Sequence, residues 1–301
     1  MNKYYIFLGI IFSCLIFAGC AHRSTQPPPK PEAAPNAAYK QGLKQLQEGN
    51  FGDAISMFTY ALQKKPQWAR AYYNRGLAFA NTKQYLKAVK DYNQAINLAP
   101  QMFRAYNNRA LAYFALGKHK LAFKDWEQSI KLDTAYTLAF YNRGKAYSKT
   151  NKYERAIIDY SKAIEQDGQF AQALNNRGVA KINIQEYEQA IADLTRAIEI
   201  SYNDPTYHYN RGVAYEGLHQ YGPAVSDYTK AIEIAPEYAA AYYNRGLLFL
   251  RLNKNERACM DLNRACQLGL CERLRTLQKK GVCEKIDDLE AVENLPSLDL
   301  S

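Results

Sequence analysis

Apolar positions recur along most of this chain at helical spacing, in pairs of segments separated by short polar breaks. Between Ala71 and Pro100, apolar side chains fall three or four residues apart on both sides of a polar break at Asn81–Gln84. That spacing places them on one face of each of two helices. The closing proline cannot continue a helix interior. The stretch therefore predicts a helix, a turn and a second helix.

The same pattern returns every 34 residues without insertion or deletion, which predicts a repeat array of seven units. Small residues let two helices approach closely, and one helix pair cannot bury its apolar face alone, so neighbouring pairs must stack. Three series of small residues mark the period: Gly42, Gly76, Ala110, Gly144, Gly178, Gly212 and Gly246; Ala54, Ala88, Ala122, Ala156, Ala190, Ala224 and Ala258; and Ala61, Ala95, Ser129, Ala163, Ala197, Ala231 and Ala265.

The period and its small–aromatic–alanine–proline signature resemble the tetratricopeptide repeat (TPR) family over residues 35–268. The resemblance implies an all-α, right-handed superhelical solenoid of seven 34-residue helix-turn-helix repeats, with a concave groove lined by the first helices. The pattern breaks after Ala265, and residues 272–280 read as a polar, basic capping helix. We expect a protein-binding array, whose partner the resemblance leaves open.

Charged residues also follow the period. Six repeats carry an arginine on the first helix and an aspartate on the second, as at Arg75 and Asp91, whereas the first repeat has Gln41 and Met57 in these places. Because each repeat has either both charged residues or neither, we predict that a guanidinium–carboxylate pair clamps the two helices of each repeat that has them. The alternative is solvated charge on both helices.

An asparagine precedes each of these arginines, although asparagine is unfavourable inside helices. Family members that hold extended peptides use an asparagine ladder at this place, and its amides bond the ligand backbone. The alternative is an asparagine retained from repeat duplication without a use. The resemblance implies the ladder role for Asn74, Asn108, Asn142, Asn176, Asn210 and Asn244.

Further side chains of the predicted groove follow from the same register, and they are mostly basic or aromatic. We therefore expect the groove to prefer proteins or extended acidic peptide segments. These residues are Arg70, Tyr73, Arg104, Asn107, Tyr141, Lys145, Lys149, Asn175, Tyr209, Glu216, Tyr243 and Arg251.

The N-terminus predicts export and a membrane anchor. Residues 1–19 combine one lysine with an apolar run and read as a signal peptide. The Ala-Gly-Cys ending resembles the lipobox of bacterial lipoproteins, which implies a lipid on Cys20, although Phe17 departs from the usual leucine. Residues 20–34 form a proline-rich tether. The alternatives are an uncleaved anchor and an ordinary signal with an incidental cysteine.

These features predict a location in the bacterial cell envelope, on the outer membrane facing the periplasm. The net charge of +10 would also suit nucleic acid, but an exported, lipid-anchored chain is not expected to meet it.

Residues 269–301 are predicted to hold a disulfide-linked capping helix and an acidic tail. An even number of cysteines in an exported chain indicates disulfides. Cys259 and Cys266 lie about 10 Å apart along one helix, too far to join. We prefer Cys266–Cys271 with Cys259–Cys283; Cys259–Cys271 with Cys266–Cys283 stays open. The irregular spacing argues against a four-cysteine zinc site.

The sequence contains no glycine-rich phosphate loop, G-x-S-x-G or H-E-x-x-H motif. We therefore expect no enzyme activity, cofactor or metal. The prediction is an envelope-anchored adaptor or scaffold, similar to lipoproteins that scaffold cell-wall hydrolases and proteases. The alternatives are a pilus or secretion-system assembly lipoprotein and a structural spacer that binds little.

Overall fold

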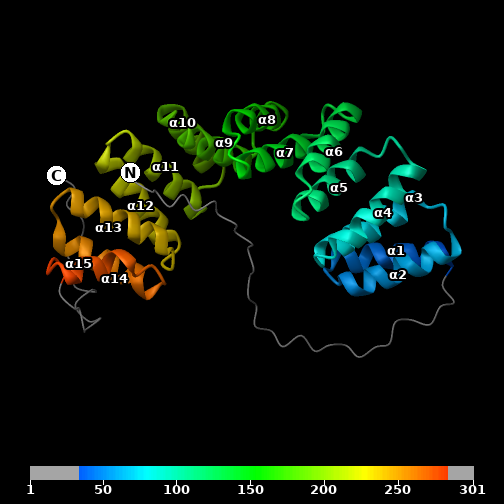
Figure 1. Cartoon of the computed structure of the whole chain (residues 1–301), viewed down its shortest axis with the longest axis horizontal. Coiled ribbons are helices and arrows are strands. Elements are labelled where there is room, and N and C mark those ends of the chain that lie inside the picture. The colour runs from blue at the N-terminus through cyan, green and yellow to red at the C-terminus, as the bar shows by residue number, and fades with distance from the viewer. Residues whose placement is uncertain (1–33, 284–301) are drawn as a thin grey trace. The chain divides into compact units, whose positions relative to one another are not determined.

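The computed structural model describes residues 34–283. The predicted signal peptide, Cys20, nearly all of the tether and most of the acidic tail lie outside these residues. The described chain divides into two compact units, residues 34–166 and residues 167–283 (Figure 1). None of the helices in the described part combines the length and the apolar character that crossing a membrane requires.

The structure confirms an all-helical repeat array in the described part of the chain, ending in a short fifteenth helix. The odd-numbered helices α1 to α13 are the first helices of the repeats, called A helices here, and the even-numbered ones are the B helices. The first unit holds α1 (Pro35–Gln47), α2 (Phe51–Lys64), α3 (Ala69–Asn81), α4 (Tyr85–Leu98), α5 (Phe103–Ala115), α6 (His119–Leu132), α7 (Thr137–Lys149) and α8 (Tyr153–Gln166). The second holds α9 (Ala171–Asn183), α10 (Tyr187–Ile200), α11 (Pro205–Gly217), α12 (Tyr221–Ile234), α13 (Ala239–Arg251), α14 (Asn255–Gln267) and α15 (Glu272–Lys279).

The small-residue series marks close contact between the two helices of a repeat. A Cβ atom built on Gly144 of α7 would lie 2.8 Å from Cε1 of Tyr160 on α8. In the third repeat the small residue is Ala110, and its large partner is the buried Trp126. Each repeat therefore pairs a small residue on its A helix with a large buried side chain on its B helix.

The turn between the A and B helices uses a left-handed backbone conformation in every repeat. The N–H of the next residue then bonds back to the A helix, as Asn50 N does to the carbonyl of Gln45 at 2.9 Å. Five of these seven left-handed residues are polar residues other than glycine, although glycine adopts this backbone conformation more readily. These residues are Gly49, Lys83, Gly117, Asn151, Gln185, His219 and Asn253, with φ between 57° and 78°.

The predicted arginine–aspartate clamp is confirmed in all six repeats that carry it. Arg75 donates from Nε and Nη2 to the two carboxylate oxygens of Asp91, at 2.7 and 2.8 Å. Its Nη1 also donates to Thr59 of the preceding B helix at 3.1 Å, so one guanidinium joins three helices. The other pairs are Arg109–Asp125, Arg143–Asp159, Arg177–Asp193, Arg211–Asp227 and Arg245–Asp261.

Aromatic rings shield the clamp in most repeats. The guanidinium carbon of Arg75 lies 5.5 Å from the ring centre of Tyr72 and 5.9 Å from that of Phe79. The fifth repeat instead has Leu174 and Lys181 in these places, and Lys181 makes a second ion pair to Asp193 at 2.8 Å. A stacked, partly shielded pair contributes more than a solvated surface pair.

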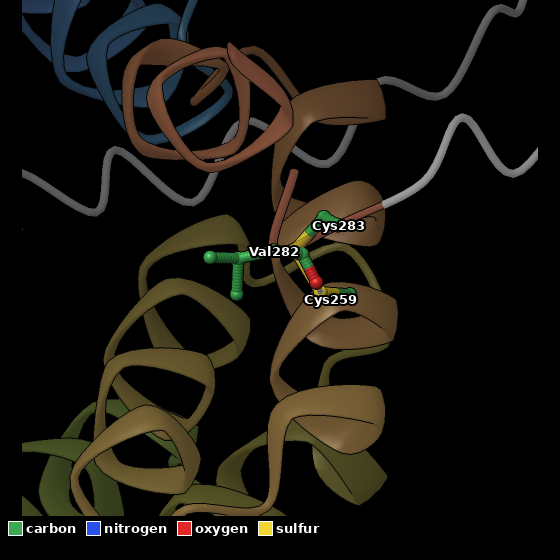
Figure 2. Close-up of a disulfide and its surroundings, with 3 residues drawn as sticks. All are labelled: Cys259, Val282 and Cys283. Atoms are coloured by element: carbon green, nitrogen blue, oxygen red, sulfur yellow. Dashed lines mark hydrogen bonds between the residues drawn. A yellow bond between two sulfur atoms is a disulfide. The ribbon is translucent and has the colours of Figure 1, made fainter. Parts of the chain in front are cut away.

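Helix α15 closes the C-terminal end of the second unit. Its Leu274 and Leu277 pack in a cluster with Leu262 of α14. The structure contains the nested disulfide pairing, Cys259–Cys283 and Cys266–Cys271. Figure 2 shows Cys283, at the end of the described chain, beside Cys259 of α14.

Candidate protein-binding surface

The A helices of each unit form the surface on which the predicted groove residues lie. In the first unit, α1 contacts α3, α3 contacts α5 and α5 contacts α7, whereas in the second α9 contacts α11. We call the surface carried by α1, α3, α5 and α7, and by α9, α11 and α13 in the second unit, the A-helix surface. Each unit has its own part of it.

The asparagine ladder joins neighbouring A helices in the first unit. Asn74 donates through Nδ2 to the hydroxyl of Tyr39 at 2.9 Å, and Asn108 donates to the hydroxyl of Tyr73 at 3.1 Å. Each bond links an asparagine to a residue 35 positions earlier, on the A helix of the preceding repeat. The prediction assigned these amides to a peptide ligand, and one hydrogen of each Nδ2 group is instead engaged within the protein.

Where the acceptor is another asparagine, the bonds connect into a chain. Asn142 donates to Oδ1 of Asn107 at 3.1 Å, and Asn107 donates to Oδ1 of Asn108 at 2.9 Å. Asn108 in turn donates to Tyr73. This chain crosses three repeats, and connected hydrogen bonds of this kind polarise and strengthen one another.

The second unit has the same arrangement, more deeply buried. Asn210 donates to Oδ1 of Asn175 at 2.8 Å, and Asn244 donates to the hydroxyl of Tyr209 at 3.0 Å. Asn175 also donates to Oδ1 of Asn176 at 3.2 Å. Asn210 is 3% exposed and Tyr209 is 0% exposed. The expectation that these two side chains are presented to a ligand therefore does not hold in the structure.

The residue before each ladder asparagine is the partner that the sequence interpretation missed. It had a signal, because this place holds only tyrosine or asparagine, both able to accept a hydrogen bond from the next repeat. The interpretation assigned these residues to the groove instead. The series is Tyr73, Asn107, Tyr141, Asn175, Tyr209 and Tyr243, and Tyr39 holds the same place in the first repeat, where Lys40 follows it.

The basic residues predicted for the groove remain exposed in the first unit. Arg70, Arg104, Lys145 and Lys149 are all exposed. The Lys145 amine lies 5.4 Å from the ring centre of Tyr141. Desolvation and the nearby charge of Lys149 lower the pKa of Lys145. Two cations are thus close enough to repel each other, and an anion between them would relieve that repulsion.

Carboxylates are almost absent from the A helices. Across α1 to α13, the A helices contain a single acidic residue, Glu216. It is 4% exposed, accepts a hydrogen bond from Tyr228 at 3.0 Å and pairs with Arg251 at 3.1 Å. Burial raises the pKa of Glu216. Glu216 and Arg251, both predicted to face the groove, thus pair with each other.

Other predicted groove residues are half-buried. Tyr73 and Tyr141 each contact the buried tyrosine of their own B helix, with ring centres 6.1 Å apart in both pairs. Tyr243 packs against the α15 cluster. Within residues 34–283, no three histidine, cysteine, aspartate or glutamate side chains gather as a metal site would require.

Family models match most of the array. Models described as tetratricopeptide repeat match residues 39–102, 137–170, 205–238 and 227–260, and a model described as TPR repeat matches residues 110–151 and 183–218. Together these ranges cover more than half of the chain. The chain belongs to the tetratricopeptide repeat family. The TPR fold is typically that of a non-catalytic scaffold, and the repeats of this array support a role as a protein-interaction scaffold.

Solved TPR structures share the fold. A TPR protein from Parabacteroides merdae is 20% identical with a TM-score of 0.60, and covers 81% of this chain and 97% of its own. A TPR protein fragment from Cytophaga hutchinsonii is 16% identical with a TM-score of 0.65, covering 79% and 98%. YrrB, described as a TPR protein with an unusual peptide-binding site, is 21% identical with a TM-score of 0.55, covering 64% and 99%. No curated protein matches the sequence.

Proposed function

We propose that this TPR array is an envelope-anchored scaffold that binds extended acidic segments of partner proteins along its A-helix surface. The observation that carries the proposal is the distribution of charge. The A helices hold one carboxylate, which is buried and paired, while Arg70, Arg104, Lys145 and Lys149 are exposed. A surface of this kind attracts a negatively charged chain and repels a positively charged one.

The asparagine ladder has a narrower role in this proposal than a peptide clamp. The Nδ2 groups of five ladder asparagines already donate to the preceding repeat and hold the A helices in register; they belong to Asn74, Asn108, Asn142, Asn210 and Asn244. A carboxamide oxygen can still accept a hydrogen bond from a ligand N–H. Specificity for the acidic segment then comes from the basic residues and from tyrosine contacts rather than from the ladder.

The membrane anchor is a separate part of the proposal and rests on the sequence of residues 1–34. Lipid on Cys20 would hold the array at a bacterial membrane, and the proline-rich tether would space it from the surface. In bacteria, Cys20→Ser should release the protein from the membrane fraction or block its processing. Normal cleavage with full membrane retention would refute the lipid site.

The binding test uses a fluorescent twelve-residue peptide of alternating aspartate and alanine, with a lysine–alanine peptide as its counterpart. We expect the acidic peptide to bind and its affinity to fall with added salt. In the Lys145→Gln/Lys149→Gln variant the affinity should drop about fivefold to tenfold, as expected for two lost charge contacts.

The matched control is Lys124→Gln/Lys131→Gln, which removes two exposed charges from the B helix α6 of the same unit. It should leave the affinity nearly unchanged. Equal losses in both variants would mean that net charge alone attracts the peptide, which would contradict a site on the A-helix surface. If neither peptide binds, the structural-spacer alternative is favoured.

A further inference from the structure

The second unit contains a pocket between its capping helix and the preceding A helices. It has a volume of about 570 Å³. One side is lined by Tyr243 and Asn244 of α13, and the other by Arg275 and Lys279 of α15. Leu270, in the turn between α14 and α15, also lines the pocket. The pocket thus combines apolar walls with two cations one helical turn apart, which is a suitable lining for a segment carrying both leucines and carboxylates.

The two cations have no carboxylate partner within 4.0 Å among the described residues. Glu272 also lines the pocket, three residues before Arg275, and no ion pair within 4.0 Å joins these two side chains. The structural role of α15 is carried by another face, where Leu274 and Leu277 are buried against α14. Packing of the cap therefore does not account for Arg275 and Lys279.

The chain itself supplies a segment of matching chemistry directly after α15. Residues 284–301 contain six acidic side chains and one lysine. Apolar residues recur at Ile286, Leu289, Val292 and Leu295, with acidic residues between them. Such a segment can place apolar side chains against the pocket wall and carboxylates beside its cations.

The described chain ends at Cys283, four residues after Lys279, which lines the pocket. The N–H of Val282 bonds to the carbonyl of Leu277 at 3.0 Å, and Gly281 has φ of 66°, so the helix ends in a left-handed turn that changes the chain direction. The disulfide from Cys283 to Cys259 fixes that turn. Asp287 and Glu293 come four and ten residues after Cys283. An extended chain of that length reaches about 13 to 35 Å.

We propose that the acidic segment Asp287–Glu293 docks in the pocket between α13 and α15, with its carboxylates on Arg275 and Lys279. The tail then covers the C-terminal end of the A-helix surface. An acidic partner would have to displace it there. The inference concerns the same surface as the proposed function but needs no partner, so the two can fail independently.

The test is zero-length carbodiimide cross-linking of the full chain, which joins a lysine amine to a carboxylate in contact with it, followed by mass spectrometry of the peptides. We expect an intramolecular link from Lys279 to Asp287–Glu293, independent of protein concentration and weakened by salt. Lys280 is the internal control, because it is exposed, adjacent and outside the pocket.

Arg275→Gln tests the site without removing the reactive amine. It should lower the yield of the Lys279 link about fivefold, which corresponds to about 1 kcal/mol. Arg273→Gln is the matched control, since Arg273 lies on the same helix, is exposed and does not line the pocket; it should leave the yield unchanged. Both substitutions are at exposed positions, and thermal melts verify that each variant is folded.

Three results would overturn the proposal. Equal yields at Lys279 and Lys280 would describe a tail that samples the surface without docking. Equal effects of Arg275→Gln and Arg273→Gln would assign the link to the general charge of α15. A link that forms only between molecules would make a second copy, not the chain's own tail, the occupant.

Discussion

Gly144→Ala tests whether the small-residue series is required by contact between the helices. The added Cβ would lie 2.8 and 2.9 Å from Cε1 and Cδ1 of Tyr160. Carbon atoms do not approach so closely without a shift. The ring cannot readily move, because Tyr160 is 1% exposed and its hydroxyl lies 3.2 Å from the Oγ atom of the buried Ser148.

Two opposing effects set the magnitude. Alanine inside a helix is favoured over glycine by about 1 kcal/mol. Overpacking a tight contact costs about 1 to 3 kcal/mol. We therefore expect Gly144→Ala to lower the free energy of unfolding by about 1 kcal/mol net.

Gly52→Ala is the matched control in the same unit. Gly52 lies in α2, and a Cβ built there meets no atom within 4 Å. This variant should be unchanged or slightly more stable, because only the propensity gain applies. Urea unfolding followed by far-UV circular dichroism measures both variants, and the difference between them should be about 1 to 2 kcal/mol.

The third repeat provides a rescue. There an alanine, Ala110, already faces the larger Trp126, so the alanine–tryptophan pair is a packing solution that this fold accepts. Gly144→Ala combined with Tyr160→Trp should recover part of the lost stability. If Gly144→Ala alone stabilises the protein as much as Gly52→Ala does, the helices are not held at this contact and the reasoning is wrong.

Three further predictions follow from other contacts. Asn142→Ala should lower the unfolding free energy by about 1 kcal/mol, because Asn107 loses its donor; an unchanged urea midpoint would mean that the ladder bonds contribute nothing. Cys259→Ser should lower the free energy of unfolding by about 3 to 4 kcal/mol, because it removes the disulfide that links two residues 24 positions apart. A reductant should destabilise the wild type more than this variant. Above pH 10 the free energy of unfolding should fall by about 1.4 kcal/mol per pH unit for each buried or half-buried tyrosine whose pKa is strongly raised by burial, because the unfolded phenol releases its proton first. Absorbance and circular dichroism should show tyrosine ionisation coinciding with unfolding. Gradual ionisation of all tyrosines near pH 10 in a folded chain would contradict this. These tyrosines are Tyr92, Tyr160, Tyr209, Tyr228 and Tyr238.

The features that depend on contacts within a repeat could be predicted from the sequence. Arg75 and Asp91 are 16 residues apart in one helix pair, so their joint presence and absence across repeats pointed to the clamp. The small residue at Gly144 likewise has its partner in the same repeat. A period of 34 residues repeats these local relations six or seven times, which makes them visible.

Features that depend on the junction between repeats were harder to predict. The ladder bonds join positions 35 apart, such as Asn108 and Tyr73, and the acceptor is a tyrosine in some repeats and an asparagine in others. Burial of Tyr209 depends on helices from several repeats. The family resemblance assigned these side chains to ligand binding, because a polar residue on an A helix gives no sign in sequence of whether a neighbour or a ligand satisfies it.

The missing clamp of the first repeat has a mechanical consequence. Gln41 and Met57 stand where the later repeats have an arginine and an aspartate, so α1 and α2 lack the ion pair that braces the six repeats after them. Any pulling force that enters the array through residue 34 loads this helix pair first. This helix pair should therefore unfold at a lower force than the braced repeats, and its unfolding would relieve the load on the rest of the array.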